Sequence, residues 1–194
     1  MSALTRNITR TFRAADESHV AAGLAWYRDA HAAAVTMSAE TGVSVAQAAG
    51  IVAALSPMLS WDRNVQAAFD VARTGTAHAV LKQNLAKAVA IREGADPAKV
   101  LGGQKVTAFY RNILSAGQDD GVTVDRHAID VALGVKHSDA TRPAMSKRAY
   151  AEIADAYRRA ARILSRERGA TITPAQIQAV TWCAWRADHA WRRA

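Results

Sequence analysis

Residues 100–134 read VLGGQKVTAFYRNILSAGQDDGVTVDRHAIDVALG, and this stretch decides the interpretation of the fold. It opens with a short apolar segment and the pair Gly102-Gly103, which permits a tight turn and a close approach of the backbone to a ligand. Residues 104–115 then predict a helix, and a glycine-bearing loop leads to Asp125. Because Asp is a favoured N-cap, Asp125 predicts the start of a second helix that ends at the next glycine.

Start and stop signals predict more helices on both sides of this stretch. Ser44 and Gln47 form a capping box, and Asp96-Pro97 places a proline in a first helical turn. No segment sustains the alternation of a strand, so we expect an all-α protein, a two-lobed helical bundle of about eight helices. The other expected helices cover roughly residues 16–40, 61–73, 77–92, 146–168 and 174 to near the C-terminus.

The chain is expected to be one domain with a loose leading segment. Residues 1–15 are predicted to be a flexible basic arm carrying Arg6, Arg10 and Arg13, and residues 16–194 a single helical domain. Half of the residues are hydrophobic, which is enough for a sizeable core. The one cysteine, Cys183, excludes an internal disulfide and a four-cysteine cluster, and we expect no metal and no cofactor. No stretch has the length of a secretory leader or of a membrane span, so the prediction is a cytoplasmic protein without a membrane partner.

Positive charge is concentrated near the C-terminus. The formal net charge is +8, and residues 142–194 hold eleven Lys and Arg against four Asp and Glu. A basic face of this kind favours a polyanion, most simply nucleic acid. A solvated basic helix face or an acidic protein partner are the alternatives that charge alone leaves open.

Residues 100–134 resemble the helix-hairpin-helix motif of one DNA glycosylase superfamily. Gly102-Gly103 followed by Gln104-Lys105 stands where that family has its hairpin, and the run from Val124 to Gly134 is similar to its aspartate loop and following helix. The segment IVAALS at 51–56 is similar to the family's first core helix. Together these stretches lie within roughly residues 45–135, about half of the chain, and the hairpin with its catalytic loop occupies residues 97–134.

The sequence departs from the family pattern in four places. The hairpin lacks the usual proline and has adjacent glycines, Pro57 and Met58 follow the Leu-Ser where glutamine is common, and Arg126 follows the aspartate where a small residue is common. The cysteines of the iron–sulfur branch are absent. The resemblance therefore indicates a small, divergent member without that cluster, for which a phage-encoded protein acting in the infected host or nucleoid is one option.

The resemblance assigns Asp125 as the catalytic carboxylate. Breaking a base–sugar bond passes through an oxocarbenium-like transition state, which a nearby carboxylate stabilises. The alternative role of Asp125 is to cap the helix that begins at Arg126, and both roles are compatible. Lys105 is either the amine nucleophile of bifunctional relatives, a phosphate contact or a solvated side chain. For His127, packing or a backbone hydrogen bond is favoured over proton transfer.

The remaining candidates concern DNA contact and base extrusion. The phosphate-binding set is Gly102, Gly103, Gln104, Lys105 and Arg126, because helix N-terminal N–H groups and cations bind phosphate. Met58, Trp61 and Tyr110 are candidates for a base pocket or a wedge, with core packing as the alternative and favoured for Tyr110. On the last helix, Trp182, Trp185 and Trp191 are expected to pack, whereas Arg186, Arg192 and Arg193 are candidate phosphate contacts.

Three functions remain open on this basis. The first is a DNA glycosylase that flips a modified or mismatched base out of duplex DNA and excises it. The second is a base-modifying transferase that uses the same fold and aspartate on a hypermodified pyrimidine. The third is a DNA-binding module that retains the fold without the chemistry.

Overall fold

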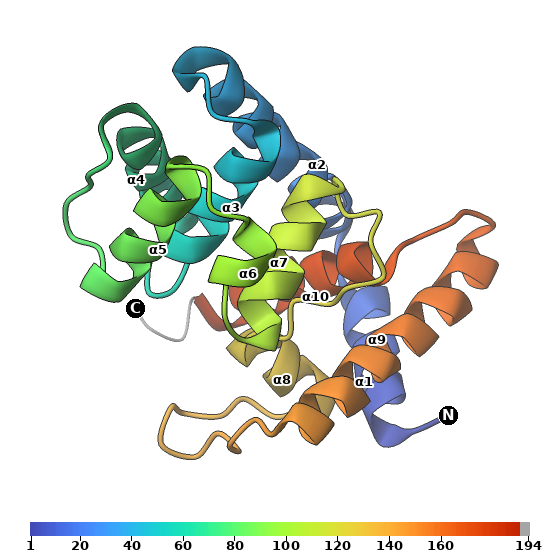
Figure 1. Cartoon of the computed structure of the whole chain (residues 1–194). Helices are drawn as coiled ribbons and strands as arrows, with labels where there is room; N and C mark the ends of the chain where they lie inside the picture. The colour runs from blue at the N-terminus through green and yellow to red at the C-terminus, as the bar shows by residue number, and fades with distance from the viewer. Residues whose placement is uncertain (191–194) are drawn as a thin grey trace. The chain divides into compact units, whose positions relative to one another are not determined.

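The computed structural model describes residues 1–190, with side chains through residue 187, and this part is all-α, with ten helices and no strand (Figure 1). The helices are α1 (Ala3–Ala14), α2 (Glu17–Thr41), α3 (Val45–Leu55), α4 (Trp61–Thr74), α5 (Lys82–Arg92), α6 (Pro97–Val100), α7 (Gln104–Leu114), α8 (Arg126–Leu133), α9 (Lys147–Arg168) and α10 (Pro174–Ala190). The all-α prediction is confirmed.

The chain divides into two compact units. Unit 1 contains residues 1–27 and 117–194, and unit 2 contains residues 28–116. The long helix α2 starts in unit 1 and continues into unit 2, and the chain returns to unit 1 at Gly117. The span expected as a single domain, 16–194, is thus shared between two units, and residues 1–15 belong to the first of them.

The expectation of a flexible arm over residues 1–15 is wrong. Residues 3–14 form α1, which Ser2 caps by accepting a hydrogen bond from the Thr5 backbone N–H. Ile8 and Phe12 are fully buried, and Thr5 and Thr9 are buried beside them. These four positions follow the spacing of one helical face, so α1 packs against α8, α9 and α10 as part of the core of unit 1.

Within unit 1, α2 approaches α10 closely at a glycine. A Cβ added to Gly23 would lie 2.3 Å from the Cα of Val180, so only glycine allows the two backbones this distance. The contact has a consequence three residues further along α2 and two residues further along α10, where Trp26 lies beside Trp182 with ring centroids 6.3 Å apart. The close packing of the two helices therefore places two tryptophans side by side.

Unit 2 is built around α3, whose residues from Ala48 to Leu55 are all buried. The predicted capping box is confirmed, because Ser44 and Gln47 exchange hydrogen bonds with each other's backbone N–H groups. The Gln47 amide also donates to the carbonyl oxygens of Ile91 and Arg92, which ties the start of α3 to the end of α5. Helices α4, α5, α6 and α7 all pack on α3.

One predicted helix start differs from the structure. Helix α4 begins at Trp61 as predicted, with Ser60 as its N-cap, although Ser60 makes no capping side-chain hydrogen bond. Helix α5 begins at Lys82 rather than near residue 77, and Ala79 in the preceding segment has a positive φ of 56°. A left-handed alanine cannot lie inside a right-handed helix, which explains the later start.

None of the described helices is by itself long and apolar enough to cross a membrane. The bent pair of α2 and α3 passes that test together, by length and composition only.

Candidate functional site

Buried tyrosines hold the segment that carries Asp125. Val122, Thr123 and Val124 are buried in unit 1. The Tyr150 hydroxyl donates to the Val122 carbonyl oxygen at 2.6 Å and accepts from the Val124 N–H at 3.2 Å. The Tyr27 hydroxyl donates to the Thr123 hydroxyl at 2.9 Å. Residues 122–124 are thus hydrogen-bonded to Tyr150 of α9 and to Tyr27 of α2, and these bonds hold the backbone immediately before Asp125 in place.

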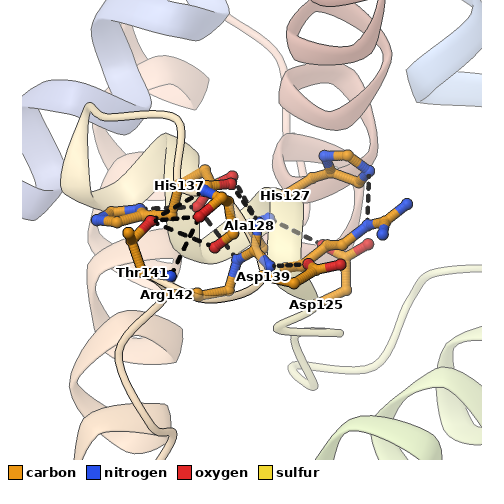
Figure 2. Close-up of polar contacts among 10 residues, drawn as sticks. Asp125, His127, Ala128, His137, Asp139, Thr141 and Arg142 are labelled. Atoms are coloured by element: carbon orange, nitrogen blue, oxygen red, sulfur yellow. Dashed lines mark hydrogen bonds and ion pairs between the residues drawn. The ribbon is translucent and has the colours of Figure 1, made fainter.

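Asp125 is the N-cap of α8, and its half-buried carboxylate binds two neutral donors. Oδ1 accepts a hydrogen bond from the Ala128 backbone N–H at 2.8 Å (Figure 2), which confirms the capping role. Oδ2 accepts from the indole Nε1 of Trp182 at 3.2 Å. Among the described side chains Asp125 has no ion-pair partner, so the carboxylate is oriented by neutral groups while its charge is not neutralised by an adjacent cation.

Aromatic and cationic side chains surround the indole that bonds Asp125. The ring of Trp182 lies edge-to-face with Trp26 and with His127, each at a centroid distance of 6.3 Å. The guanidinium of Arg186 lies over the Trp182 ring at 4.3 Å, a cation–π contact. We name Asp125, His127, Trp26, Trp182 and Arg186 the Asp125 cluster. All five belong to unit 1.

The His127 imidazole is partly buried, and this favours its neutral form. Burial lowers the pKa of His127 below its ordinary 6.5, and the nearby positive charges of Arg126 and Arg186 lower it further, against the opposing effect of Asp125. Its Nε2 receives a hydrogen bond from Arg126 Nε at 3.3 Å. The ring therefore contributes packing next to Trp182, in line with the favoured interpretation of this residue.

Sequence reasoning missed a second polar centre on α8. Asp130 is only 2% exposed, and its carboxylate binds His137 Nδ1 at 3.0 Å and Arg142 Nη2 at 3.2 Å. Arg142 also donates to the His137 carbonyl oxygen at 2.8 Å and pairs with Asp139 (Figure 2). Hydrogen bonding to Asp130 is the main cause that raises the pKa of Arg142. The segment 135–145 is thus attached to α8 through one buried carboxylate.

The predicted hairpin lies in unit 2 and presents a helix start to solvent. Gly102, Gly103 and Gln104 are exposed, and Gly103 has a φ of 82°, which glycine adopts without strain. No side chain caps α7, so the N–H groups of its first turn remain available to an anion. Lys105 is half-buried in that turn, and Lys87 Nζ lies 3.9 Å from the position that a Cβ on Gly102 would occupy.

The three candidates for base pocket or wedge differ in exposure. Met58 is 90% exposed and has a positive φ of 71°, so an apolar side chain stands out from a strained turn. Trp61 is half-buried at the first position of α4. Tyr110 is 8% exposed, and burial raises the pKa of its hydroxyl, so it packs in the core of unit 2 instead of lining a surface pocket.

The predicted residues are distributed over both units. The hairpin and the pocket or wedge candidates belong to unit 2, whereas Asp125 and the exposed Arg126 belong to unit 1. The candidate phosphate contacts Arg192 and Arg193 and the packing residue Trp191 lie outside the described residues. The described part contains no group of three His, Cys, Asp or Glu side chains that would hold a metal ion.

Three members of the Asp125 cluster were missed or assigned another role. Trp26 was not singled out, Trp182 was expected only to pack, and Arg186 was expected to bind phosphate instead of stacking on an indole. The spacing of Trp182 and Arg186, one turn apart on a helix, was the available signal. It did not indicate Asp125 as a partner, because the two residues are 57 positions apart.

Comparison with known proteins gives a family without an assigned activity. No curated protein and no solved structure matches the chain. A family model matches residues 1–189, and the chain therefore belongs to that family, a family of unknown function (DUF7178).

Proposed function

We propose that the protein is a DNA base-flipping enzyme, a glycosylase that hydrolyses the N-glycosidic bond of a modified or mismatched base with Asp125 as its catalytic carboxylate. The observation that carries the proposal is the state of this side chain. A half-buried carboxylate is held by two N–H donors beside two indole rings, with its charge not neutralised by an ion pair among the described residues.

The chemistry requires a fixed negative charge. As the bond between C1′ and the base nitrogen breaks, positive charge develops on the sugar, and a carboxylate stabilises it or accepts a proton from the attacking water. The water oxygen bonds to C1′, the base leaves with the electron pair of the broken bond, and one proton of the water ends on the base while the other stays on the new hydroxyl. Holding Oδ1 and Oδ2 by hydrogen bonds means that the carboxylate needs little reorganisation during this step.

The surroundings of the carboxylate suit an extruded base. Trp26 and Trp182 supply aromatic surface, and stacking on such surface is how flipped or single-stranded bases are commonly held. In unit 2, the uncapped start of α7 with Lys105 and Lys87 suits a phosphate group, and exposed Met58 suits insertion into a base stack. Each of these features supports DNA as the substrate on chemical grounds.

The decisive experiment is to incubate the protein with DNA that carries a panel of damaged and hypermodified bases and to resolve the products by mass spectrometry. Asp125→Asn retains an acceptor for the Ala128 N–H and removes the charge, so we expect free base from the wild type and about 1,000-fold slower release from the variant. The matched control is Asp16→Asn. Asp16 is exposed and accepts a hydrogen bond from the His19 N–H at 2.8 Å, so it shares the capping chemistry without the indoles.

The products separate the three functions. Free base whose release depends on Asp125 supports the glycosylase. A nucleoside of altered mass with its glycosidic bond intact, again dependent on Asp125, replaces the glycosylase with a base-modifying transferase. Equal product from the wild type and Asp125→Asn contradicts the catalytic role, and DNA binding without any product across the panel favours the binding module.

A further inference from the structure

Helix α9 presents a row of three arginines along one face. Arg159, Arg162 and Arg166 are all exposed, and their spacing of three and then four residues places them within a narrow sector of the helix. Among the described residues, none of the three guanidinium groups forms an ion pair. We name these residues the Arg159 row.

The acidic residues of α9 are bonded to other cations. Glu152 pairs with Arg148 at 2.9 Å, Asp155 pairs with Arg158 at 2.7 Å, and Glu167 binds Arg13 of α1. Helix α9 therefore carries two kinds of arginine: some are paired with a carboxylate of the protein, and those of the Arg159 row are exposed to solvent without such a pair among the described residues. Like charges one turn apart on a helix repel each other and destabilise it. A bound anionic ligand would reduce this repulsion.

Helix α9 runs along α1 (Figure 1). An open depression lies beside the Arg159 row. Its volume is about 300 Å³, and its lining is Met1, Thr5, Arg159, Arg162, Ile163 and Arg166. No aromatic side chain is among these lining residues, and three of the six are arginines. This cationic lining matches an extended anion.

We propose that the Arg159 row binds the phosphate backbone of one DNA strand, as a contact surface separate from the Asp125 cluster and the hairpin. From Arg159 to Arg166 the helix rises by about 10 Å, and one strand of B-form DNA carries a phosphate per about 3.4 Å of axis, so the row matches roughly three phosphates. The guanidinium group binds phosphate through paired N–H donors, which suits arginine to this role. The inference rests on the proposed function insofar as it takes DNA as the polyanion.

The test measures binding rather than catalysis. Affinity for an unmodified duplex is determined by fluorescence anisotropy between 50 and 200 mM salt, for the wild type and for the triple variant Arg159→Gln, Arg162→Gln, Arg166→Gln. Each phosphate contact contributes about 0.9 to the slope of log affinity against log salt, so the variant slope is expected to be shallower by about 2.7. Over this salt range the wild type then loses about 40-fold more affinity than the variant does.

A control variant that removes the same number of positive charges elsewhere distinguishes the effect of the Arg159 row from the effect of net charge. Arg28→Gln, Arg73→Gln and Arg148→Gln remove three exposed arginines that are each paired with a carboxylate. If this control changes the slope as much as the row variant, or if the row variant leaves the slope unchanged, the proposal is overturned. Should the triple variant not fold by circular dichroism, the single variant Arg162→Gln carries the test with an expected change of about 0.9.

The two proposals fail in distinguishable ways. If no product depends on Asp125 but the row variant has the expected shallower salt slope, the catalytic proposal alone is contradicted. A row variant that keeps the salt slope of the wild type contradicts the phosphate contact alone.

Discussion

The two carboxylates of α8 lie five positions apart and have opposite environments. At the start of the helix, Asp125 is half-buried and bound by a backbone N–H and an indole N–H. In the middle of the helix, Asp130 is 2% exposed and bound by a guanidinium and an imidazole. The same side chain thus has two uses: a buried charge that is matched by a cation cannot lose its partner without destabilising the fold, whereas one held by neutral donors retains its field for a ligand.

The partners of the two carboxylates also come from different distances along the chain. Asp130 binds residues 7 and 12 positions away, within its own following loop. The indole that bonds Asp125 comes from α10, and that helix is held against α2 by the contact at Gly23. The following predictions test this division, from the largest expected effect to the smallest.

Asp130→Ala is expected to lower the free energy of unfolding by about 3 kcal/mol, because the change leaves the Arg142 guanidinium, 14% exposed, without its buried partner. Urea denaturation measures the effect. Asp125→Asn serves as the comparison and is expected to change stability by less than about 1 kcal/mol, since the cap acceptor remains. Equal losses for the two variants would remove the distinction between them.

Gly23→Ala is expected to destabilise unit 1 by about 2 kcal/mol, because the added Cβ would meet the Val180 backbone at 2.3 Å and force α2 away from α10. The near-ultraviolet circular dichroism of Trp26 and Trp182 should change with it. The control is Gly50→Ala in unit 2, whose Cβ would lie 2.9 Å from Pro97. That variant should destabilise the protein and leave the tryptophan signal unchanged, and the opposite pattern would contradict the role of Gly23.

Trp182→Phe is expected to lower kcat/KM about 10-fold, because the carboxylate loses the donor to Oδ2 while the aromatic surface is retained. Trp185→Phe, on the same helix, is the control and should have a smaller effect. Steady-state kinetics on the substrate found in the product screen provide the measurement. An unchanged rate for Trp182→Phe would show that the indole only packs.

The smallest effect concerns pH. Since burial lowers the pKa of His127, the unfolded chain takes up a proton below pH 6.5 that folded His127 does not. The free energy of unfolding therefore falls as the pH drops from 6.5 towards the lowered pKa. His127→Gln removes this contribution, so the free energy of unfolding of the variant should fall less steeply with decreasing pH over that window. The difference between the two slopes should correspond to the uptake of less than one proton on unfolding. The measurement is denaturation at several pH values. If the free energy of unfolding changes with pH in the same way for the wild type and His127→Gln, the lowered pKa of His127 is contradicted.

Local signals account for much of the agreement between prediction and structure. Ser44, Asp96, Asp125 and Ser146 were identified as helix starts and all cap by accepting a backbone N–H hydrogen bond. A cap depends on a side chain and the backbone two or three residues later, and such a pattern is visible in the sequence. Helix α1 was not predicted, because two of the four buried positions on its inner face, Thr5 and Thr9, are polar, so the stripe that they form with Ile8 and Phe12 is not an apolar pattern.

The amino-acid sequence by itself determined the all-α class, most helix boundaries and the position of Asp125 at a helix start, because these properties arise from periodicity and from interactions between residues within one turn. Only the tertiary structure decided which carboxylate of α8 is neutralised and which is held by an indole, and which arginines of α9 remain unpaired. The physical reason is distance along the chain. An indole 57 residues away or a carboxylate 154 residues away becomes a neighbour only when whole helices pack, and no local pattern encodes that arrangement.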